Sequence, residues 1–144
     1  MSEGIKLTEK EMRYISLFEA ATGANIVDCL EYRDIVAFVV GEGEMPRVLA
    51  KKGAKIQSFS KLIKKKVKVV EYSDDPAKFI QNALQPARLL EPVRIIERAD
   101  GRKIAVALVD SRYRALAIGK EGKNIELVRI LSKRHHNIDH VMIR

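Results

Sequence analysis

The sequence contains a single cysteine, and only 6% of its residues are aromatic. One cysteine cannot form an internal disulfide bond, so we expect a reducing compartment, with Cys29 as a buried small hydrophobic residue rather than a reactive thiol. Apolar runs such as Ile35 to Val40 are far shorter than the roughly 20 residues that a membrane-spanning helix needs. The start shows no charged segment followed by an apolar one, so we expect no export signal and a cytoplasmic location without a membrane.

The scarcity of aromatic residues also bears on how the chain could recognise a ligand. Most of the four Tyr and four Phe fall at apolar-face positions, with Tyr14 and Tyr113 as the expected exceptions. The chain therefore lacks the exposed aromatic platform on which an RRM sheet stacks bases.

Catalytic and metal-binding patterns are also missing from the sequence. It has no recognisable Ser-His-Asp arrangement or paired carboxylates, and Gly41-Glu42-Gly43 lacks the Lys-Ser/Thr of a nucleotide-binding loop. His135, His136 and His140 lie close to Asp139, but adjacent side chains of an extended segment point to opposite faces and no cysteine supports them. We expect surface histidines, no metal, no cofactor and no enzymatic activity.

Positive charge is abundant and unevenly distributed. The formal net charge is +8 and the pI is near 9.7, which favours a polyanionic partner, nucleic acid first and an anionic membrane second. Nine basic residues and no acidic one lie between positions 47 and 68, and seven basic and two acidic residues lie between positions 112 and 134. A solvated lysine face is the alternative interpretation, but both clusters surround the same kind of turn.

That turn is clearest at Gly119-Lys120-Glu121-Gly122. The segment 110–117 before it has a helical pattern, and Ile125, Val128 and Leu131 recur at helical spacing after it. Glycine lets the backbone turn sharply and approach another backbone closely. The second helix then begins at the turn, where unpaired N–H groups and the helix dipole suit a phosphate group. A purely structural turn is the alternative for such a motif standing alone.

The motif has a counterpart in the first half of the chain. Residues 48–56 align with residues 117–125, so that Lys51 matches Lys120 and Gly53 matches Gly122. Ala50 replaces the first glycine, and a positive φ would cost it about 1 kcal/mol or more. We expect the first loop to hold a phosphate less well than the second, with the charges of Lys51 and Lys52 as a partial offset.

Turn and capping signals predict the same order of elements, α-β-β-α-α-β, in each half. In the first half we expect a helix from a capping box at Thr8 to Gly23, strands over 24–32, 35–40 and 67–72, and a short helix at Pro46 followed by a longer one. In the second half we expect a helix over 76–84, strands over 92–98, 103–109 and 138–143, and two helices flanking Gly119 to Gly122. The class is α+β, with domains over 1–73 and 74–144 joined by the short hinge 74–76 as a near-rigid tandem.

The order of elements, together with several sequence segments, resembles that of a known family. A Gly-x-x-Gly loop between two helices against a three-stranded sheet resembles a KH domain, and the element order resembles its prokaryotic form, type II. Two such domains in tandem, with the segments Tyr72–Pro76, Phe79–Ala87 and Leu116–Asn124, closely resemble the NusA family. The resemblance implies an RNA-binding factor of transcription termination and antitermination, with single-stranded RNA and RNA polymerase as partners and a monomeric state.

One departure from the bacterial pattern narrows this resemblance. Bacterial members carry a polymerase-binding domain and an OB-type domain ahead of the KH pair, so the chain resembles the short archaeal form, and a polymerase contact through the missing domain is not implied. The alternative is a KH-fold scaffold on RNA polymerase or the ribosome that binds structured RNA only weakly.

The candidate RNA-binding residues follow from the two loops, their basic flanks and the aliphatic groove of a KH fold. For Ile118 and Ile125 the plain core is the alternative. The candidates are Gly119, Lys120, Glu121, Gly122, Lys123, Ile118, Ile125, Arg112 and Arg129 in the second half, and Ala50, Lys51, Lys52, Gly53 and Lys55 in the first.

Overall fold

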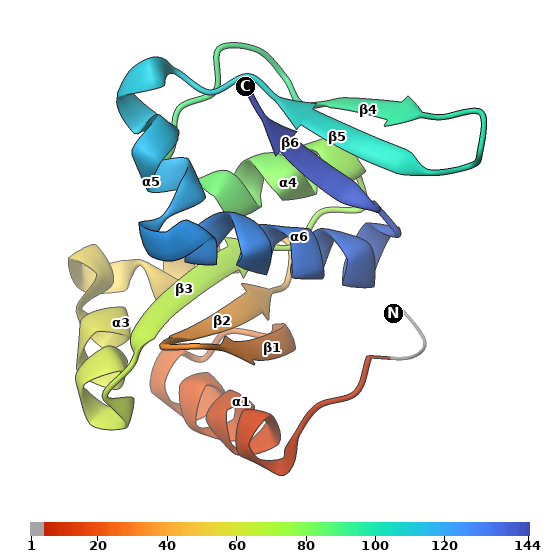
Figure 1. The fold of residues 1–144 in the computed structure, drawn as a ribbon. Coiled ribbons are helices and arrows are strands. Elements are labelled where there is room, and N and C mark those ends of the chain that lie inside the picture. Colours follow the sequence, from red (N-terminus) through yellow and green to blue (C-terminus); the bar gives the residue numbers. More distant parts are fainter. Residues whose placement is uncertain (1–4) are drawn as a thin grey trace. The chain divides into compact units, whose positions relative to one another are not determined.

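The structure is a computed structural model that describes residues 5–144, and it divides into two compact units. Lys6–Ser73 forms one unit and Asp74–Arg144 belongs to the other. Each unit has the order helix, strand, strand, helix, helix, strand around a three-stranded sheet (Figure 1). The expected α+β class and element order are therefore confirmed. No helix within residues 5–144 is both long and apolar enough to cross a membrane.

The strands of the first unit are ordered β1-β2-β3. Its elements are α1 (Glu9–Thr22), β1 (Ile26–Tyr32), β2 (Ile35–Val40), α2 (Met45–Val48), α3 (Ala50–Ile63) and β3 (Lys66–Glu71). β1 pairs antiparallel with β2, whereas β2 pairs parallel with β3. A parallel pair needs a crossover connection, and α2 and α3 form it. The turn between these two helices therefore lies midway along the crossover.

The second unit repeats this topology with strand order β4-β5-β6 and a parallel β5–β6 pair. Its elements are α4 (Pro76–Leu84), β4 (Arg94–Glu97), β5 (Lys103–Ala107), α5 (Arg114–Ile118), α6 (Lys123–His136) and β6 (His140–Ile143). Short 3₁₀ turns at Ser111–Tyr113 and Lys120–Gly122 precede α5 and α6. The strands are shorter than expected over 92–98, 103–109 and 138–143, and at the first of these Pro92 has no N–H to donate to a sheet.

Three phenylalanines from three elements form the centre of the first unit. Phe18 of α1 stacks on Phe38 of β2 with ring centroids 4.1 Å apart, and Phe59 of α3 meets both rings edge-on at 5.1 and 5.7 Å. Offset-stacked and edge-to-face pairs add to the free energy of burial. These contacts fix both helices on one face of the sheet.

Three side chains of this unit lie elsewhere than the sequence suggested. The buried stripe of α1 runs through residues 11, 14, 18 and 22, so Tyr14 points inward and is only 8% exposed. Met12, which the sequence spacing places on one helical face with Ile15 and Phe18, is 51% exposed. Leu62 of α3, which follows Ile56 and Phe59 at helical spacing, is 69% exposed. The apolar periodicity was too broad in both helices to define the buried face. Cys29, in contrast, is fully buried as expected.

The second unit is packed as its sequence pattern predicts. Phe79, Ile80, Ala83 and Leu84 of α4 are all buried, and α4 lies beside α6 (Figure 1). The α6 stripe is buried too, so the predicted faces of both helices are confirmed.

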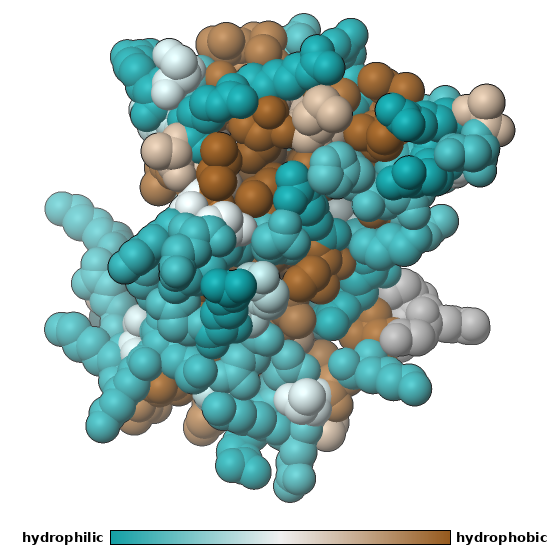
Figure 2. Space-filling view, in the orientation of Figure 1, coloured by the Kyte–Doolittle hydropathy of each residue, from teal (hydrophilic) through white to brown (hydrophobic). Residues whose placement is uncertain are grey.

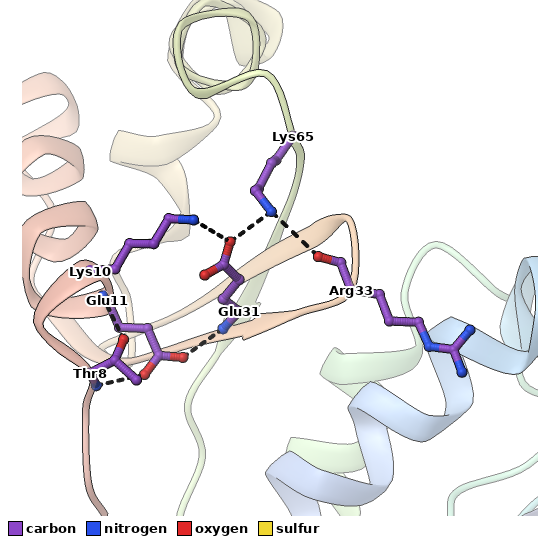
Figure 3. A network of polar contacts seen from close by, with 6 residues as sticks. All are labelled: Thr8, Lys10, Glu11, Glu31, Arg33 and Lys65. Atoms are coloured by element: carbon purple, nitrogen blue, oxygen red, sulfur yellow. Dashed lines mark hydrogen bonds and ion pairs between the residues drawn. The ribbon is translucent and has the colours of Figure 1, made fainter.

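A polar network joins the start of α1 to β1 and to the segment before β3 (Figure 3). The predicted capping box is present, since the Glu11 N–H donates to Thr8 Oγ1 at 3.0 Å and the Thr8 N–H donates to Glu11 Oε1 at 2.9 Å. The other carboxylate oxygen of Glu11 accepts from the Glu31 N–H at 2.7 Å. The Glu31 carboxylate in turn lies 2.7 Å from Lys65 Nζ and 3.2 Å from Lys10 Nζ.

This network predicts a pH-dependent contribution to stability. The hydrogen bond from Lys65 is the main cause that lowers the pKa of Glu31 below its ordinary value of 4.5. The carboxylate therefore stabilises the fold fully above pH 4.5, and this contribution is lost as the pH falls through the lowered pKa of the folded state. We expect Glu31→Gln to lower the free energy of unfolding by about 1 kcal/mol at pH 7, and by progressively less as the pH falls below 4, as measured by urea unfolding.

Glu9→Gln is the matched control, because it makes the same chemical change in an ion pair whose two side chains are 69% and 88% exposed. Exposed pairs contribute little, so this variant should change stability by less than about 0.5 kcal/mol at either pH. Equal effects of the two substitutions at pH 7 would contradict the role given to Glu31.

Candidate nucleic-acid interface

The loop between α5 and α6 has a backbone conformation that only glycine can adopt at its first position. Gly119 has φ 80° and ψ 165°, a region that is essentially restricted to glycine. A Cβ added there would lie 2.7 Å from the Cβ of Asn124 and 2.8 Å from its backbone nitrogen. The first glycine is therefore needed for both its dihedral angles and its close approach to α6.

Asn124 closes this loop from the other side. Its Nδ2 donates to the Ala117 carbonyl at 2.8 Å, which ties the first turn of α6 to the last turn of α5. The Gly122 N–H donates to the Gly119 carbonyl at 3.0 Å within the loop. The sequence analysis missed Asn124, although an amide side chain two residues after the second glycine is a signal that could have suggested it.

The closed loop exposes the start of α6. Gly122, with φ 72°, occupies the N-cap position, and no described side chain caps the helix there. Lys120 and Glu121 are both exposed. The side chain of Lys123 is only 15% exposed and its Nζ lies 3.8 Å from Glu121 Oε1, so Lys120 is the lysine of the loop that points freely to solvent. Uncapped N–H groups and one exposed ammonium form a site suited to an anion.

The corresponding loop of the first unit keeps the left-handed conformation of its last two residues but lacks the first glycine and the asparagine. Lys51, Lys52 and Gly53 have φ of 57°, 58° and 76°, so the regular part of α3 begins after them. Ala50 has no positive φ, and the strain expected there falls on the two lysines instead. Lys55 stands where the second unit has Asn124, so the amide link across the loop is missing from this position.

Two arginines expected at the interface are held in structural contacts. Arg112 pairs with Asp110 at 2.8 Å, and its hydrogen bonds lower the pKa of Asp110 to about 2. The Arg112 side chain is nevertheless 74% exposed. Arg129 Nε donates to the Val141 carbonyl at 3.1 Å, and Arg129 also pairs with Glu126 at 2.6 Å. Arg129 therefore links α6 to β6, and Arg112 is the more accessible of the two.

The structure separates the two isoleucines. Ile125 is 5% exposed and belongs to the core, which corrects its placement in the groove, whereas Ile118 is 36% exposed. Leu116, on the same short helix, is 51% exposed and was not anticipated. Apolar surface gathers between α5 and the strands of this unit in Figure 2. An aliphatic surface therefore lies next to the turn from Gly119 to Gly122.

Not all of the basic residues between positions 47 and 68 are available to a ligand. Lys65 is bound to Glu31 and to the Arg33 carbonyl (Figure 3). Burial lowers the pKa of Lys68 to about 8, so this lysine is not part of an exposed patch. Lys51 and Lys52 are exposed and Lys55 is half-buried.

The histidines near the end of the chain pack against an aromatic ring. The rings of His135 and His136 lie 5.4 and 5.2 Å from Phe79, and both residues are half-buried. Within the part of the chain that the structure describes, no group of three or more His, Cys, Asp or Glu side chains is placed to hold a metal ion.

The loop geometry predicts unequal effects of the same substitution at two glycines. Gly119→Ala should lower the free energy of unfolding by about 3 kcal/mol or more, because it combines backbone strain with a steric overlap. A Cβ at Gly53 would meet nothing within 4 Å, so Gly53→Ala should cost only the left-handed conformation, about 1–2 kcal/mol. Urea unfolding of both variants measures this difference, and a cost at Gly53 equal to that at Gly119 would refute the close approach to Asn124.

Comparisons with known proteins agree with this architecture. Residues 76–142 match the model of the NusA-like second KH domain. The probable transcription termination protein NusA of Halococcus morrhuae is 37% identical over 137 residues, which cover 95% of this chain and 96% of the relative. The protein of the same name from Methanocaldococcus jannaschii is 31% identical over 96% of this chain and 75% of its own length. The crystal structure of APE1850 superposes with a TM-score of 0.76 at 31% identity, covering 96% of this chain and all of that one.

The similarities to whole relatives extend over both units. Each unit has the element order, the parallel strand pair and the two-helix crossover of a type II KH domain, so the fold is two such domains in tandem. With a relative that is 37% identical across nearly the full length of both proteins, this chain belongs to the NusA family.

Proposed function

We propose that this protein is a transcription termination and antitermination factor that binds single-stranded RNA, with the loop from Gly119 to Gly122 as its principal contact. The observation that carries the proposal is the closed loop in front of the uncapped start of α6. Relatives named as probable transcription termination proteins support the cellular role. RNA polymerase is the proposed protein partner in that role.

A phosphate group fits the second loop for electrostatic reasons. No described side chain caps the start of α6, which carries the positive end of the helix dipole, although its first N–H, that of Lys123, donates to the Lys120 carbonyl. Lys120 adds a full charge on an exposed side chain, while Glu121 is drawn towards Lys123. Because the link between Asn124 and Ala117 fixes the loop before any ligand arrives, little conformational entropy is lost on binding.

Bases next to that phosphate would contact aliphatic side chains. Ile118 and Leu116 are the exposed apolar residues beside the loop. All four phenylalanines of the chain are at most 3% exposed, so none of them offers a stacking platform. This arrangement supports recognition of unpaired bases through their edges and through apolar contact, as in other KH grooves. Exposed Arg112, in the 3₁₀ turn that precedes α5, would add a further phosphate contact.

The first loop is proposed as a weaker RNA contact. Lys51, Lys52 and Lys55 supply charge there, but Ala50 replaces the close-packed glycine and the asparagine link is replaced by Lys55. A protein scaffold without RNA binding would not need a closed glycine loop that presents exposed charge, which favours RNA binding for the second unit.

A double substitution tests the second loop. Lys120→Asp combined with Glu121→Asp places two carboxylates where a phosphate is expected, so RNA affinity should fall by several kcal/mol through repulsion and loss of the lysine contact. Glu121 has φ 57°, which Asp tolerates better than most residues. Stability should therefore change by no more than about 0.5 kcal/mol. The measurement is fluorescence anisotropy with a single-stranded RNA, together with a thermal melt.

The control places Asp at the two corresponding positions of the first loop. Lys51→Asp combined with Lys52→Asp alters two exposed residues and lowers the net charge by four, against two for the second-loop variant, and it should still weaken RNA binding less than the change in the second loop. Unchanged RNA affinity of the Lys120/Glu121 variant, with an intact melt, would remove this loop as the principal site.

The basic surface also predicts a strong salt dependence. If four to six phosphates are contacted, the logarithm of the association constant should fall against the logarithm of salt concentration with a slope of roughly −3 to −4, from about −0.7 per contact for single strands. Titrations of the full chain with single-stranded RNA at several salt concentrations measure this slope, and duplex RNA of the same sequence is the comparison. A slope near zero would exclude phosphate contacts as the main source of affinity.

A further inference from the structure

An open hollow lies between α1 and α3 in the first unit. It has a volume of about 360 Å³ and is lined by Ala21, Lys51, Ala54, Lys55, Ser58, Phe59 and Leu62. Ala54, Lys55, Ser58, Phe59 and Leu62 recur at helical spacing and form one stripe along α3, and Lys51 lies in the loop before its regular part. Leu62 at one end of the stripe is 69% exposed, and Leu17, one turn before Ala21 on α1, is 45% exposed. The hollow is therefore an apolar surface continued by two exposed leucines.

In the second unit, the residues equivalent to two members of this stripe are buried. By the repeat, Ser58 and Leu62 correspond to Leu127 and Leu131 of α6. Both leucines are fully buried, on a helix that packs against α4. The first unit thus has a small polar residue and an exposed leucine at the positions where the second unit has two buried leucines. The hollow is therefore not a requirement of the shared fold.

The rim of the hollow carries charge of one sign. Lys51 and Lys55 line it, and exposed Lys52 and Lys61 lie on the same helix. No acidic residue occurs between positions 47 and 68. An apolar floor with a cationic rim complements a ligand that has an apolar face flanked by carboxylates.

We propose that this hollow is a docking site for an acidic amphipathic helix of a partner protein. The apolar face of that helix would fill the space between Ala21, Ala54 and Leu62, and its carboxylates would pair with Lys51 and Lys55. Laying an amphipathic helix into an apolar groove is a common mode of peptide recognition. This inference goes beyond the RNA-binding role of the second loop, and because Lys51 and Lys55 are also the proposed weaker RNA contact, the helix and RNA would compete for them.

The lining favours a protein segment over a nucleic acid. Phe59, the one aromatic residue of the lining, is 3% exposed and offers no face for stacking. Ser58 and the two lysines are the only polar side chains among the lining residues, which leaves few groups to read the edge of a base. The lysine side chains would attract a nucleic acid as well as an acidic protein segment. The apolar lining is therefore the feature that favours the protein segment.

The test first selects peptides that bind the intact protein and then identifies the surface to which they bind. A displayed library of helical 18-residue peptides, with apolar residues on one face and Glu, Asp, Gln or Ala elsewhere, is selected against the full chain. Binding of the enriched peptides is then measured by fluorescence anisotropy for the wild-type protein, for Leu62→Gln and for Leu90→Gln. Leu90 is the matched control, because it is a leucine 60% exposed in the other unit, and glutamine keeps the net charge in both variants.

Support requires enrichment of acidic peptides whose affinity falls at least tenfold in Leu62→Gln and by less than twofold in Leu90→Gln. The Lys120/Glu121 variant should bind these peptides normally, and Leu62→Gln should bind single-stranded RNA normally. The proposal is wrong if no acidic peptide is enriched, if the enriched peptides are insensitive to Leu62→Gln, or if that substitution weakens RNA binding instead. If the Lys120/Glu121 variant keeps its RNA affinity, this result would count against the proposed RNA site but not against the docking site.

Discussion

The close contact between Gly119 and Asn124 is the constraint on which the second loop depends. It brings the end of α5 against the start of α6 closely enough that a Cβ at Gly119 would lie 2.7 Å from the Cβ of Asn124. The asparagine amide then reaches the Ala117 carbonyl at 2.8 Å. Two helix ends are thereby fixed to each other, and no described side chain caps the start of α6. Because a preformed site does not have to become ordered when the ligand binds, less of the interaction free energy is offset by lost conformational entropy.

The first unit shows how the same topology is maintained without that contact. Its loop has Ala50 and Lys55 in place of the glycine and the asparagine, and left-handed angles fall on Lys51 and Lys52. Stability of this unit comes from other sources, namely the three packed phenylalanine rings and the Glu31 network. Because these contacts lie away from the loop, the loop is free to differ without loss of the fold.

Much of this architecture could be predicted from the sequence, because its signals are local. The Thr8 capping box and the buried face of α4 depend on residues only three or four positions apart. Predictions failed where a role depends on distant groups. Arg129 counted as free charge in the sequence, yet it is bound to the Val141 carbonyl and Glu126. Asn124 was missed because its partner is identified only once the turn brings Ala117 near.

The net charge explains less of the proposed recognition than the groups that surround the individual lysine side chains. A charge of +8 attracts any polyanion, so it cannot distinguish RNA from an acidic protein segment. Exposed Lys120 belongs to the turn before α6, whose start has no side-chain cap and suits the compact oxygens of a phosphate. Lys51 and Lys55 border an apolar hollow, where a phosphodiester would leave the apolar lining unfilled. The groups around the lysines, rather than the charge itself, therefore make the second loop the principal proposed RNA contact and add a protein ligand to the weaker contact of the first.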